Sequence, residues 1–443
     1  MIALKQEVPD ILNTFSVCTV KTLHANKHEN IIKNSAGILS IITGVGLENA
    51  RHAMHWISRH TKPLLVINMG SCASTVPYMT QQFISPQYCA NESNKHAYPS
   101  IGCWPFRTKQ DIQTVAQIKS VNQASPNHQG PYLDMESHAF AKGCYEANIA
   151  FCCIKYVTDN NTTDALYQFK ALLSQLKTQF NKLLSEMLSP PNLQDMTVII
   201  PSYNREAFLK RSIESVLNQT QAIHCIVVDD ASTDQTKQML KHFKDRIKVC
   251  THTVNKGVSA ARNTGLKATK SEWVMFLDSD DQWLPTKVQS QCNYIRRYPY
   301  FSMLQSNECW YRHHQLVKQA RHLQNQEGYI WKSCVKRCKI AASALLIEKQ
   351  ICPLFDEELR ACEDYDAWLY LTRRYLVGLD QNQAVLKYAG HEGQLSQISR
   401  PLDRYRVLSL DKQLKNEAHP YFKQYLQEKK VEKQGFLNKS KGL

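Results

Sequence analysis

The sequence predicts an α/β protein of two domains, and three observations lead to this prediction. First, the chain has 443 residues, which is too long for one ordinary hydrophobic core. Second, short apolar runs alternate with helix-like segments, as in proteins built around parallel sheets. Third, Pro190-Pro191 ends a long helical pattern, and a new apolar strand begins just beyond it. We therefore expect one α/β domain on each side of these prolines.

Composition is typical of a globular protein, with 43% hydrophobic and 21% charged residues. Basic side chains number 54 and acidic ones 39, and the resulting formal charge of +15 favours anionic partners such as nucleotides, nucleic acid or an anionic membrane face. The 15 cysteines form no disulfide framework, the N-terminus lacks the apolar core of a signal peptide, and no apolar run could span a bilayer. We therefore expect free thiols and a cytoplasmic location.

Helical spacing and the two prolines define four segments. Apolar residues recur at helical spacing over residues 165–188, and this pattern stops before Pro190-Pro191. The expected segments are a first domain (1–188), a linker (189–196), a second domain (197–400) and a basic helical tail (401–443). A solvated helix is the expected state of this tail, and a docking surface for a membrane or a partner is the alternative.

The second domain carries clusters of polar residues where apolar strands end. The strands expected at Thr197–Ile200, Cys225–Val228 and Trp273–Leu277 end in Pro201-Ser202-Tyr203-Asn204, Asp229-Asp230 and Asp278–Asp281. Because the carboxyl ends of parallel strands share one edge of a sheet, these clusters can converge on one crevice. Carboxylates at such a place suit Mg2+ or Mn2+, and these cations suit phosphorylated ligands. The sequence therefore indicates nucleotide-diphosphate chemistry.

An EF-hand is excluded at the Asp278–Asp281 acids. Counted from Asp278, the glycine position of such a loop holds Trp283 and its closing glutamate position holds Gln289.

Four motifs in the second domain resemble those of the family 2 glycosyltransferases of the GT-A fold, in their order and spacing. They are Val-Ile-Ile-Pro-Ser-Tyr-Asn, Val-Val-Asp-Asp-Ala-Ser-Thr-Asp, Asn-Lys-Gly-Val-Ser-Ala-Ala-Arg-Asn and Leu-Asp-Ser-Asp-Asp. The resemblance implies a hexosyltransferase-type enzyme that transfers a sugar from a nucleotide-diphosphate sugar, a UDP-sugar or a related donor. It also implies donor binding by Pro201, Tyr203, Asp230 or Asp229, Lys256, Arg262 and Asp278. For Arg262 the alternative is a pair with a structural carboxylate.

The same resemblance implies a metal site and a catalytic base. Asp280 and Asp278 would hold Mn2+ or Mg2+, with Asp280 as the main ligand, and His391 would lie near the metal or the diphosphate. The Glu363-Asp364 pair resembles the family's motif for the base, so we expect Asp364 in this role and Glu363 as its substitute. Inverting transfer needs such a carboxylate at the acceptor hydroxyl, opposite the departing diphosphate. An acid pair that complements a helix dipole is the alternative.

Motifs of the first domain resemble the nucleoside phosphorylase and nucleosidase superfamily, especially the methylthioadenosine/adenosylhomocysteine nucleosidases, which have an α/β sandwich fold. They are a Gly44-Val45-Gly46 loop after a strand at Gly37–Thr43, an Asn68–Ser71 turn after a strand at Leu64–Ile67, Asp134-Met135-Glu136, and Thr158-Asp159 after a strand. The resemblance implies nucleoside binding by Ser71, Met135 and Glu136. Asp159 would protonate the departing purine, and Glu7 would activate water.

Asn68 favours hydrolysis over phosphorolysis in this domain. It stands where related phosphorylases often carry an arginine that binds phosphate, and an amide offers no charge for that purpose.

Metal-dependent, inverting glycosyl transfer is the function that we expect for the chain. Purine nucleosidase or phosphorylase activity of the first domain is one alternative, as the main or a second function. The other alternative is a nucleotide-binding scaffold without turnover. Separately, a truncated first domain is expected, because only Met1-Ile2 precedes the Ala3–Glu7 segment, where the family has a first strand. The acceptor is expected to be a glycan, a lipid or a nucleoside derivative. Further expected partners are a second copy of the chain and, through the basic tail, the inner membrane face; nucleic acid is not expected.

Overall fold

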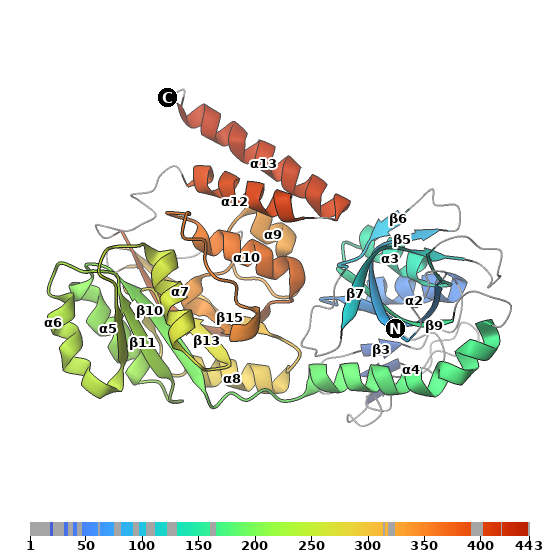
Figure 1. Cartoon of the computed structure of the whole chain (residues 1–443), viewed down its shortest axis with the longest axis horizontal. Coiled ribbons are helices and arrows are strands. Elements are labelled where there is room, and N and C mark those ends of the chain that lie inside the picture. The colour runs from blue at the N-terminus through green and yellow to red at the C-terminus, as the bar shows by residue number, and fades with distance from the viewer. Residues whose placement is uncertain are drawn as a thin grey trace. The chain divides into compact units, whose positions relative to one another are not determined.

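The computed structural model describes residues 18–20, 31–33, 39–41, 47–60, 63–74, 81–91, 97–102, 111–121, 131–159, 165–312, 315–317, 324–390, 402–417 and 419–441 (Figure 1). Its backbone forms two compact units. Unit 1 comprises Met1–Ser189 with Tyr298–Tyr300, and unit 2 comprises Pro190–Arg297 with Phe301–Leu443. Both units combine helices with sheets, so the predicted α/β class is confirmed. Within the described ranges, every helix is too short or too polar to cross a membrane.

Unit 1 is built on a six-stranded sheet that closes on itself. Its strands in spatial order are β6 (Ala97–Pro99), β5 (Phe83–Asn91), β7 (Ile112–Ser120), β8 (Tyr132–Asp134), β4 (Val66–Ser74) and β9 (Phe151–Asp159). Because β5 also pairs with β9, five of these strands form a ring, and β6 extends it. A separate antiparallel sheet contains β1 (Cys18–Val20), β2 (Ile31–Lys33) and β3 (Leu39–Ile41).

The helices of unit 1 cover this sheet with apolar faces. They are α2 (Leu47–His60), α3 (Ser137–Glu146) and α4 (Ala165–Leu188). Helix α4 has the bounds that the apolar spacing predicts, and it buries Leu176, Phe180 and Leu183. The Phe180 ring meets the edge of the Phe83 ring of β5, with centroids 5.2 Å apart. Burial of such rings dominates the energetics of a core.

One expectation for unit 1 is wrong. Asn68–Ser71 is not a turn, because β4 continues through it to Ser74. The backbone of this segment pairs in parallel with β9, with Gly70 opposite Lys155 and Ser71 opposite Tyr156. The ladder hydrogen bonds available on a neighbouring strand therefore prevail over the local turn preference of Asn and Gly.

Unit 2 is built on a nine-stranded sheet in the order β12-β11-β10-β13-β17-β15-β18-β14, with β16 paired to β15. The strands are β10 (Met196–Ser202), β11 (His224–Asp229), β12 (Lys248–Thr251), β13 (Trp273–Phe276), β14 (Gln282–Trp283), β15 (Met303–Arg312), β16 (Gln315–Val317), β17 (Leu345–Glu348) and β18 (Gly378–Ala389). Strands β10 to β13 are parallel. Their order reverses between β10 and β13, and open α/β sheets bind ligands at the carboxyl edge of such a switch point.

Helices pack on this sheet and bring the motifs to its carboxyl edge. They are α5 (Glu206–Leu217), α6 (Thr236–Leu240), α7 (Val258–Ala268), α8 (Lys287–Arg297), α9 (Trp331–Lys336), α10 (Glu363–Arg374), α12 (Asp403–Asn416) and α13 (Pro420–Lys441), with short 3-10 turns at Lys241–Arg246, Ala342–Ala344 and Lys349–Ile351. Helix α7 lies close to β10 because its Gly265 faces Ile199, and a Cβ at Gly265 would collide with that side chain. This close approach fixes the start of α7 near the ends of β10 and β11.

The C-terminal tail is helical, but the expectation of a solvated helix is wrong for its inner face. Leu410 of α12 and Phe422 and Leu426 of α13 are buried in the main core of unit 2. The Phe422 ring meets Trp331 of α9 at a centroid distance of 5.0 Å. Figure 1 shows α12 lying across α9 and α10. The two helices are therefore part of the folded unit.

Candidate active site

A cavity of about 1060 Å3 opens at the carboxyl edge of the unit 2 sheet. Its walls come from the loops after β10, β11 and β13, the start of α7 and α10, the ends of β15 and β18, and the start of α12. Small-molecule sites usually occupy roughly 300–1,000 Å3. The cavity therefore has room for a nucleotide-sugar and a second substrate.

Backbone strain is concentrated around this cavity. Five non-glycine residues of the described chain have positive φ, and three of them, Asn204 (51°), Ala231 (62°) and Cys362 (61°), lie in the loops that follow β10 and β11 or directly before Glu363. Such conformations cost energy and persist only where surrounding contacts hold them, so they are often found at functional sites. The loops that carry the motifs are therefore held in defined shapes.

The loops after β10 and β11 form one end of the cavity. Pro201, Tyr203 and Asp230 line it, and the Tyr203 side chain is exposed. The Asp230 carboxylate accepts hydrogen bonds from the backbone N–H groups of Lys256 (2.9 Å) and Gly257 (2.7 Å), and its Oδ1 lies 2.6 Å from Nδ1 of His252. Asp230 thereby ties the loop before α7 to the end of β11.

The structure distinguishes between Asp229 and Asp230, which the sequence left open, and places Lys256. Asp229 is fully buried and accepts a hydrogen bond from the backbone N–H of Ser232 at 3.1 Å, whereas Asp230 lines the cavity. Asp230 is thus the better placed of the two for donor binding. The Lys256 side chain is exposed, and its neighbours Asn255 and Gly257 line the cavity, so its role toward the donor stays a prediction.

The Asp278–Asp281 loop lies in the middle of the cavity. Its backbone is held by α5: the Arg211 guanidinium donates to the Asp280 carbonyl at 2.9 Å, and the Ser212 hydroxyl donates to the Asp281 carbonyl at 2.6 Å. The Asp278 and Asp280 side chains are partly exposed and line the cavity. These contacts let the loop present its carboxylates at a fixed place.

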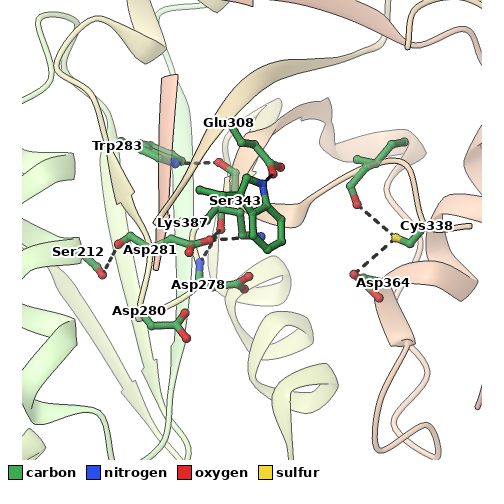
Figure 2. Close-up of polar contacts among 12 residues, drawn as sticks. Ser212, Asp278, Asp280, Asp281, Trp283, Glu308, Cys338, Ser343, Asp364 and Lys387 are labelled. Atoms are coloured by element: carbon green, nitrogen blue, oxygen red, sulfur yellow. Dashed lines mark hydrogen bonds and ion pairs between the residues drawn. The ribbon is translucent and has the colours of Figure 1, made fainter. Parts of the chain in front are cut away.

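Asp281 has a different environment from its two neighbours. Its carboxylate is buried, accepts a hydrogen bond from the Ser343 hydroxyl at 2.6 Å and lies 3.5 Å from the Lys387 ammonium (Figure 2). Burial raises the pKa of Asp281 to about 8, although Lys387 opposes this shift. Asp281 therefore anchors the Asp278–Asp281 loop to Ser343 and Lys387. The sequence motifs did not identify Ser343 and Lys387 as site residues.

Asp278 and Asp280 are the acids that could hold a divalent cation. Carboxylate oxygens suit Mg2+ or Mn2+, and both side chains border the cavity. Among the described residues, however, no group of three or more His, Cys, Asp and Glu side chains is arranged to hold a metal ion. A cation held by these two acids would therefore need further oxygen ligands from outside the described protein groups. His391 lies outside the described residues.

Arg262 of α7 connects the two acid motifs. Its guanidinium donates to Glu363 Oε1 at 2.5 Å and to Asp278 Oδ1 at 2.9 Å, and it packs on the Phe355 ring at 5.2 Å. Only 4% of Arg262 is exposed. Arg262 also lines the cavity, so its pairing with carboxylates agrees with the alternative, and its role in donor binding stays a prediction. We call Arg262, Glu363 and Asp278 the Arg262 cluster.

The Glu363-Asp364 pair begins helix α10. Glu363 is buried in the Arg262 cluster, and burial raises its pKa while Arg262 opposes the shift. Asp364 is half-buried, lines the cavity and lies across the open centre from Asp278 and Asp280 (Figure 2). The Cys338 thiol donates a weak hydrogen bond to Asp364 Oδ2, with an Sγ–Oδ2 distance of 3.8 Å. Asp364 is thus better placed than Glu363 to receive a proton from a bound molecule.

The residues expected to bind a nucleoside in unit 1 lie around the C-terminal half of β4. Ser71 is on β4, Asp159 ends β9 opposite Ala73, and Met135-Glu136 follows β8, which pairs with β4 on its other side. The structure therefore places Ser71 and Asp159 on paired strands and Glu136 directly after a third strand that pairs with β4. Glu7 and the Gly44–Gly46 loop lie outside the described residues.

A buried lysine that the sequence motifs did not identify holds this region together. Lys155 of β9 lies 3.0 Å from Asp134 Oδ2 and 3.7 Å from Glu136 Oε2, and both carboxylates are buried. Burial lowers the pKa of Lys155, but these two carboxylates prevail and raise it overall. Asn68 is buried beside them and donates to the Ser137 hydroxyl at 3.0 Å. Its amide thus bonds the first residue of α3.

Sequence comparison places unit 2 among known glycosyltransferases. The model of the family described as "Glycosyl transferase family 2" matches residues 197–341. The chain is 31% identical over 184 residues to the Escherichia coli UDP-Glc:alpha-D-GlcNAc-diphosphoundecaprenol beta-1,3-glucosyltransferase WfgD, and this match covers 40% of the chain and 70% of the relative. It is 27% identical to the putative teichuronic acid biosynthesis glycosyltransferase TuaG of Bacillus subtilis, with 44% and 78% covered.

Solved structures of two kinds resemble the chain. S. aureus TarS in complex with UDP-GlcNAc has a TM-score of 0.41 and 20% identity, and the match covers 49% of this chain and 66% of that one. The 5'-methylthioadenosine/S-adenosylhomocysteine nucleosidase of Neisseria meningitidis has a TM-score of 0.35 and 18% identity, with 42% and 95% covered. From the family model and the extent of the match to the E. coli relative, the chain belongs to glycosyltransferase family 2.

Proposed function

We propose that unit 2 transfers a sugar from a UDP-sugar to a sugar hydroxyl of an acceptor that is linked through a diphosphate to a lipid carrier. The observation that carries this proposal is the position of Asp364 across the cavity from Asp278 and Asp280. The E. coli relative, named for UDP-glucose and an N-acetylglucosaminyl diphosphate lipid, supports the two substrate classes. Work on a lipid-linked acceptor would take place at the cytoplasmic membrane face.

The proposed chemistry is a single displacement with inversion. The acceptor oxygen attacks the anomeric carbon while the bond to the donor diphosphate breaks, and Asp364 takes the proton of the hydroxyl. The nucleoside lies at the Pro201, Tyr203 and Asp230 end of the cavity. Mn2+ or Mg2+ held by Asp280 and Asp278 would neutralise charge on the departing diphosphate.

The test is sugar transfer from labelled UDP-glucose or UDP-N-acetylglucosamine to an N-acetylglucosaminyl diphosphate with a short alkyl chain. Purified full-length protein is depleted of metal and then titrated with Mn2+ or Mg2+. We expect metal-dependent product that is lost in Asp280→Asn but retained in Asp245→Asn, which changes an exposed acid of unit 2. Full activity of Asp280→Asn would refute the metal assignment. Failure of every donor to bind or react would refute the function.

N-ribosyl hydrolysis by unit 1 is a second candidate. It is favoured by the placement of Ser71 and Asp159 on paired strands, with Glu136 at the start of α3 just after β8. We expect adenine release from methylthioadenosine or adenosylhomocysteine, and its loss in Asp159→Asn. Nucleoside binding without release in both proteins would instead support a binding scaffold.

A further inference from the structure

The wall of the cavity beyond Asp364 comes from α12, which lies outside the segment that matches the family model. Leu402 and Arg406 line this wall. The Cys362 thiol lies 3.8 Å from the Leu402 carbonyl oxygen, so the start of α12 lies beside the residues that precede Asp364. Cys362, Asp364 and Arg406 all line the cavity. Arg406 therefore borders the part of the cavity where Asp364 would meet an acceptor.

Among the described residues, the Arg406 guanidinium donates to the side chain of Asp403 alone. Nη1 donates to Asp403 Oδ1 at 3.0 Å, whereas Nε is buried and has no hydrogen-bond partner in the described part of the chain. A guanidinium carries five N–H donors in a planar fork. Arg262, by comparison, donates from both of its Nη groups to carboxylates, although its Nε, like that of Arg406, is buried without a partner among the described residues. Arg406 bonds one carboxylate through Nη1 and therefore keeps more of its donors for a ligand.

Helix α12 holds this arginine firmly relative to the base. Lys412 of α12 pairs with Asp366 of α10 at 2.7 Å and with Asp356 at 2.9 Å, and Gln413 donates to Asp366 at 3.0 Å. Leu410 is buried in the core between these contacts. The distance between the Arg406 and Asp364 backbones is therefore set by packing and does not depend on a bound ligand.

We propose that Arg406 binds a phosphate of the acceptor's diphosphate group while the acceptor hydroxyl lies at Asp364; this inference rests on the function proposed above. The forked guanidinium matches phosphate oxygens, and a charge-assisted pair of this kind is stronger than a neutral hydrogen bond. The donor diphosphate belongs with the acids at Asp278 and Asp280. The phosphate at Arg406 is thus a second one, and Arg406 distinguishes a diphosphate-linked acceptor from a neutral glycoside.

Direct binding tests this inference without requiring turnover. The probes are the N-acetylglucosaminyl diphosphate with an alkyl chain, the neutral N-acetylglucosamine glycoside with the same chain, and UDP. The proteins are the full-length chain, Arg406→Ala, Arg406→Lys and Arg404→Ala, which removes an exposed arginine of the same helix. We expect Arg406→Ala to bind the diphosphate acceptor roughly 10- to 100-fold more weakly, as for the loss of hydrogen bonds to a charged group.

The other variants and probes distinguish phosphate binding by Arg406 from a general effect on the protein. Arg406→Lys should be intermediate because it keeps the charge but loses the fork, and Arg404→Ala should match the unchanged protein. UDP and the neutral glycoside should bind all four proteins alike. Equal affinity of Arg406→Ala and the unchanged protein for the diphosphate acceptor would overturn the inference, as would a parallel loss of UDP binding. If UDP binds but the diphosphate acceptor does not, this inference fails alone; if no nucleotide binds, the proposed function fails.

Discussion

The Arg262 cluster offers a direct test of how the two acid motifs are held together. Replacing Arg262 by Met keeps an apolar side chain on the Phe355 ring but removes the cation shared by Glu363 and Asp278. Glu363 then remains buried without its partner, whereas Asp278, whose side chain is 31% exposed, can be hydrated. We therefore expect most of the loss of stability to come from Glu363.

The magnitude follows from the burial of this pair. Removing one partner of a buried ion pair usually costs about 3–5 kcal/mol, because a buried charge is left uncompensated. The exposed Asp278 interaction adds at most about 1 kcal/mol. For a unit of this size, each kcal/mol corresponds to roughly 2–4 °C in the unfolding midpoint. Arg262→Met should therefore lower the midpoint of unit 2 by roughly 6–24 °C.

Tryptophan fluorescence during thermal unfolding is the appropriate assay, since five of the seven tryptophans lie in unit 2 (Trp273, Trp283, Trp310, Trp331 and Trp368). The loss of stability caused by Arg262→Met should become smaller as the pH is lowered. Burial already raises the folded pKa of Glu363, and loss of Arg262 raises it further, so protonation at lower pH stabilises the folded variant. The double variant Arg262→Met/Glu363→Gln should recover most of the loss.

The control is Arg360→Met, which removes an exposed arginine of the same unit and should change stability by less than about 0.5 kcal/mol. A loss below about 1 kcal/mol in Arg262→Met, or an equal loss in the single and double variants, would show that this cluster is not a tightly coupled unit.

Three further predictions follow from the same contacts. Asp364→Asn should lower kcat of sugar transfer by about 100- to 10,000-fold with UDP affinity retained, and a loss below tenfold would exclude it as the base. Leu410→Ala should cost about 2–5 kcal/mol in urea unfolding because Leu410 is fully buried, whereas the 48% exposed Leu408 should tolerate the same change; equal effects would contradict docking of the tail. Burial lowers the pKa of Lys287 from 10.5 to about 7, so the unfolded chain binds more protons between these values and stability should rise from about pH 7 to 10. Lys287→Met should flatten this rise, and an unchanged slope would contradict it.

Local rules predicted the fold of unit 2 and the residues around its cavity. An apolar run followed by acids indicates a buried strand end, and parallel strand ends share one edge, so the convergence of Pro201, Asp230 and Asp278 could be inferred from spacing alone. The α4 helix was likewise predictable from its apolar period. Membership of glycosyltransferase family 2 followed from the same motifs.

Pairing between distant side chains could not be inferred in this way. Lys155 and Lys387 are buried in the structure, but lysine is usually exposed, so nothing local marks either one as an ion-pair partner. Asn68–Ser71 has the composition of a turn, and only the adjacent β9 makes it a strand. Arg262 lies in a motif, yet its partners come from 16 and 101 positions further along the chain. Which carboxylate such a residue meets depends on tertiary packing.

The contacts of α10 explain why Asp364, and not its neighbours, faces the cavity centre. Glu363 is paired with Arg262 on α7, and Asp366 is paired with Lys412 on α12. Residues three apart lie on nearly the same side of a helix, so these two anchors fix its rotation. Asp364 lies between them in sequence and must point elsewhere, toward the acids of the Asp278–Asp281 loop. The orientation of the proposed base therefore depends on α12, and the tail belongs to the catalytic architecture as much as the acid motifs do.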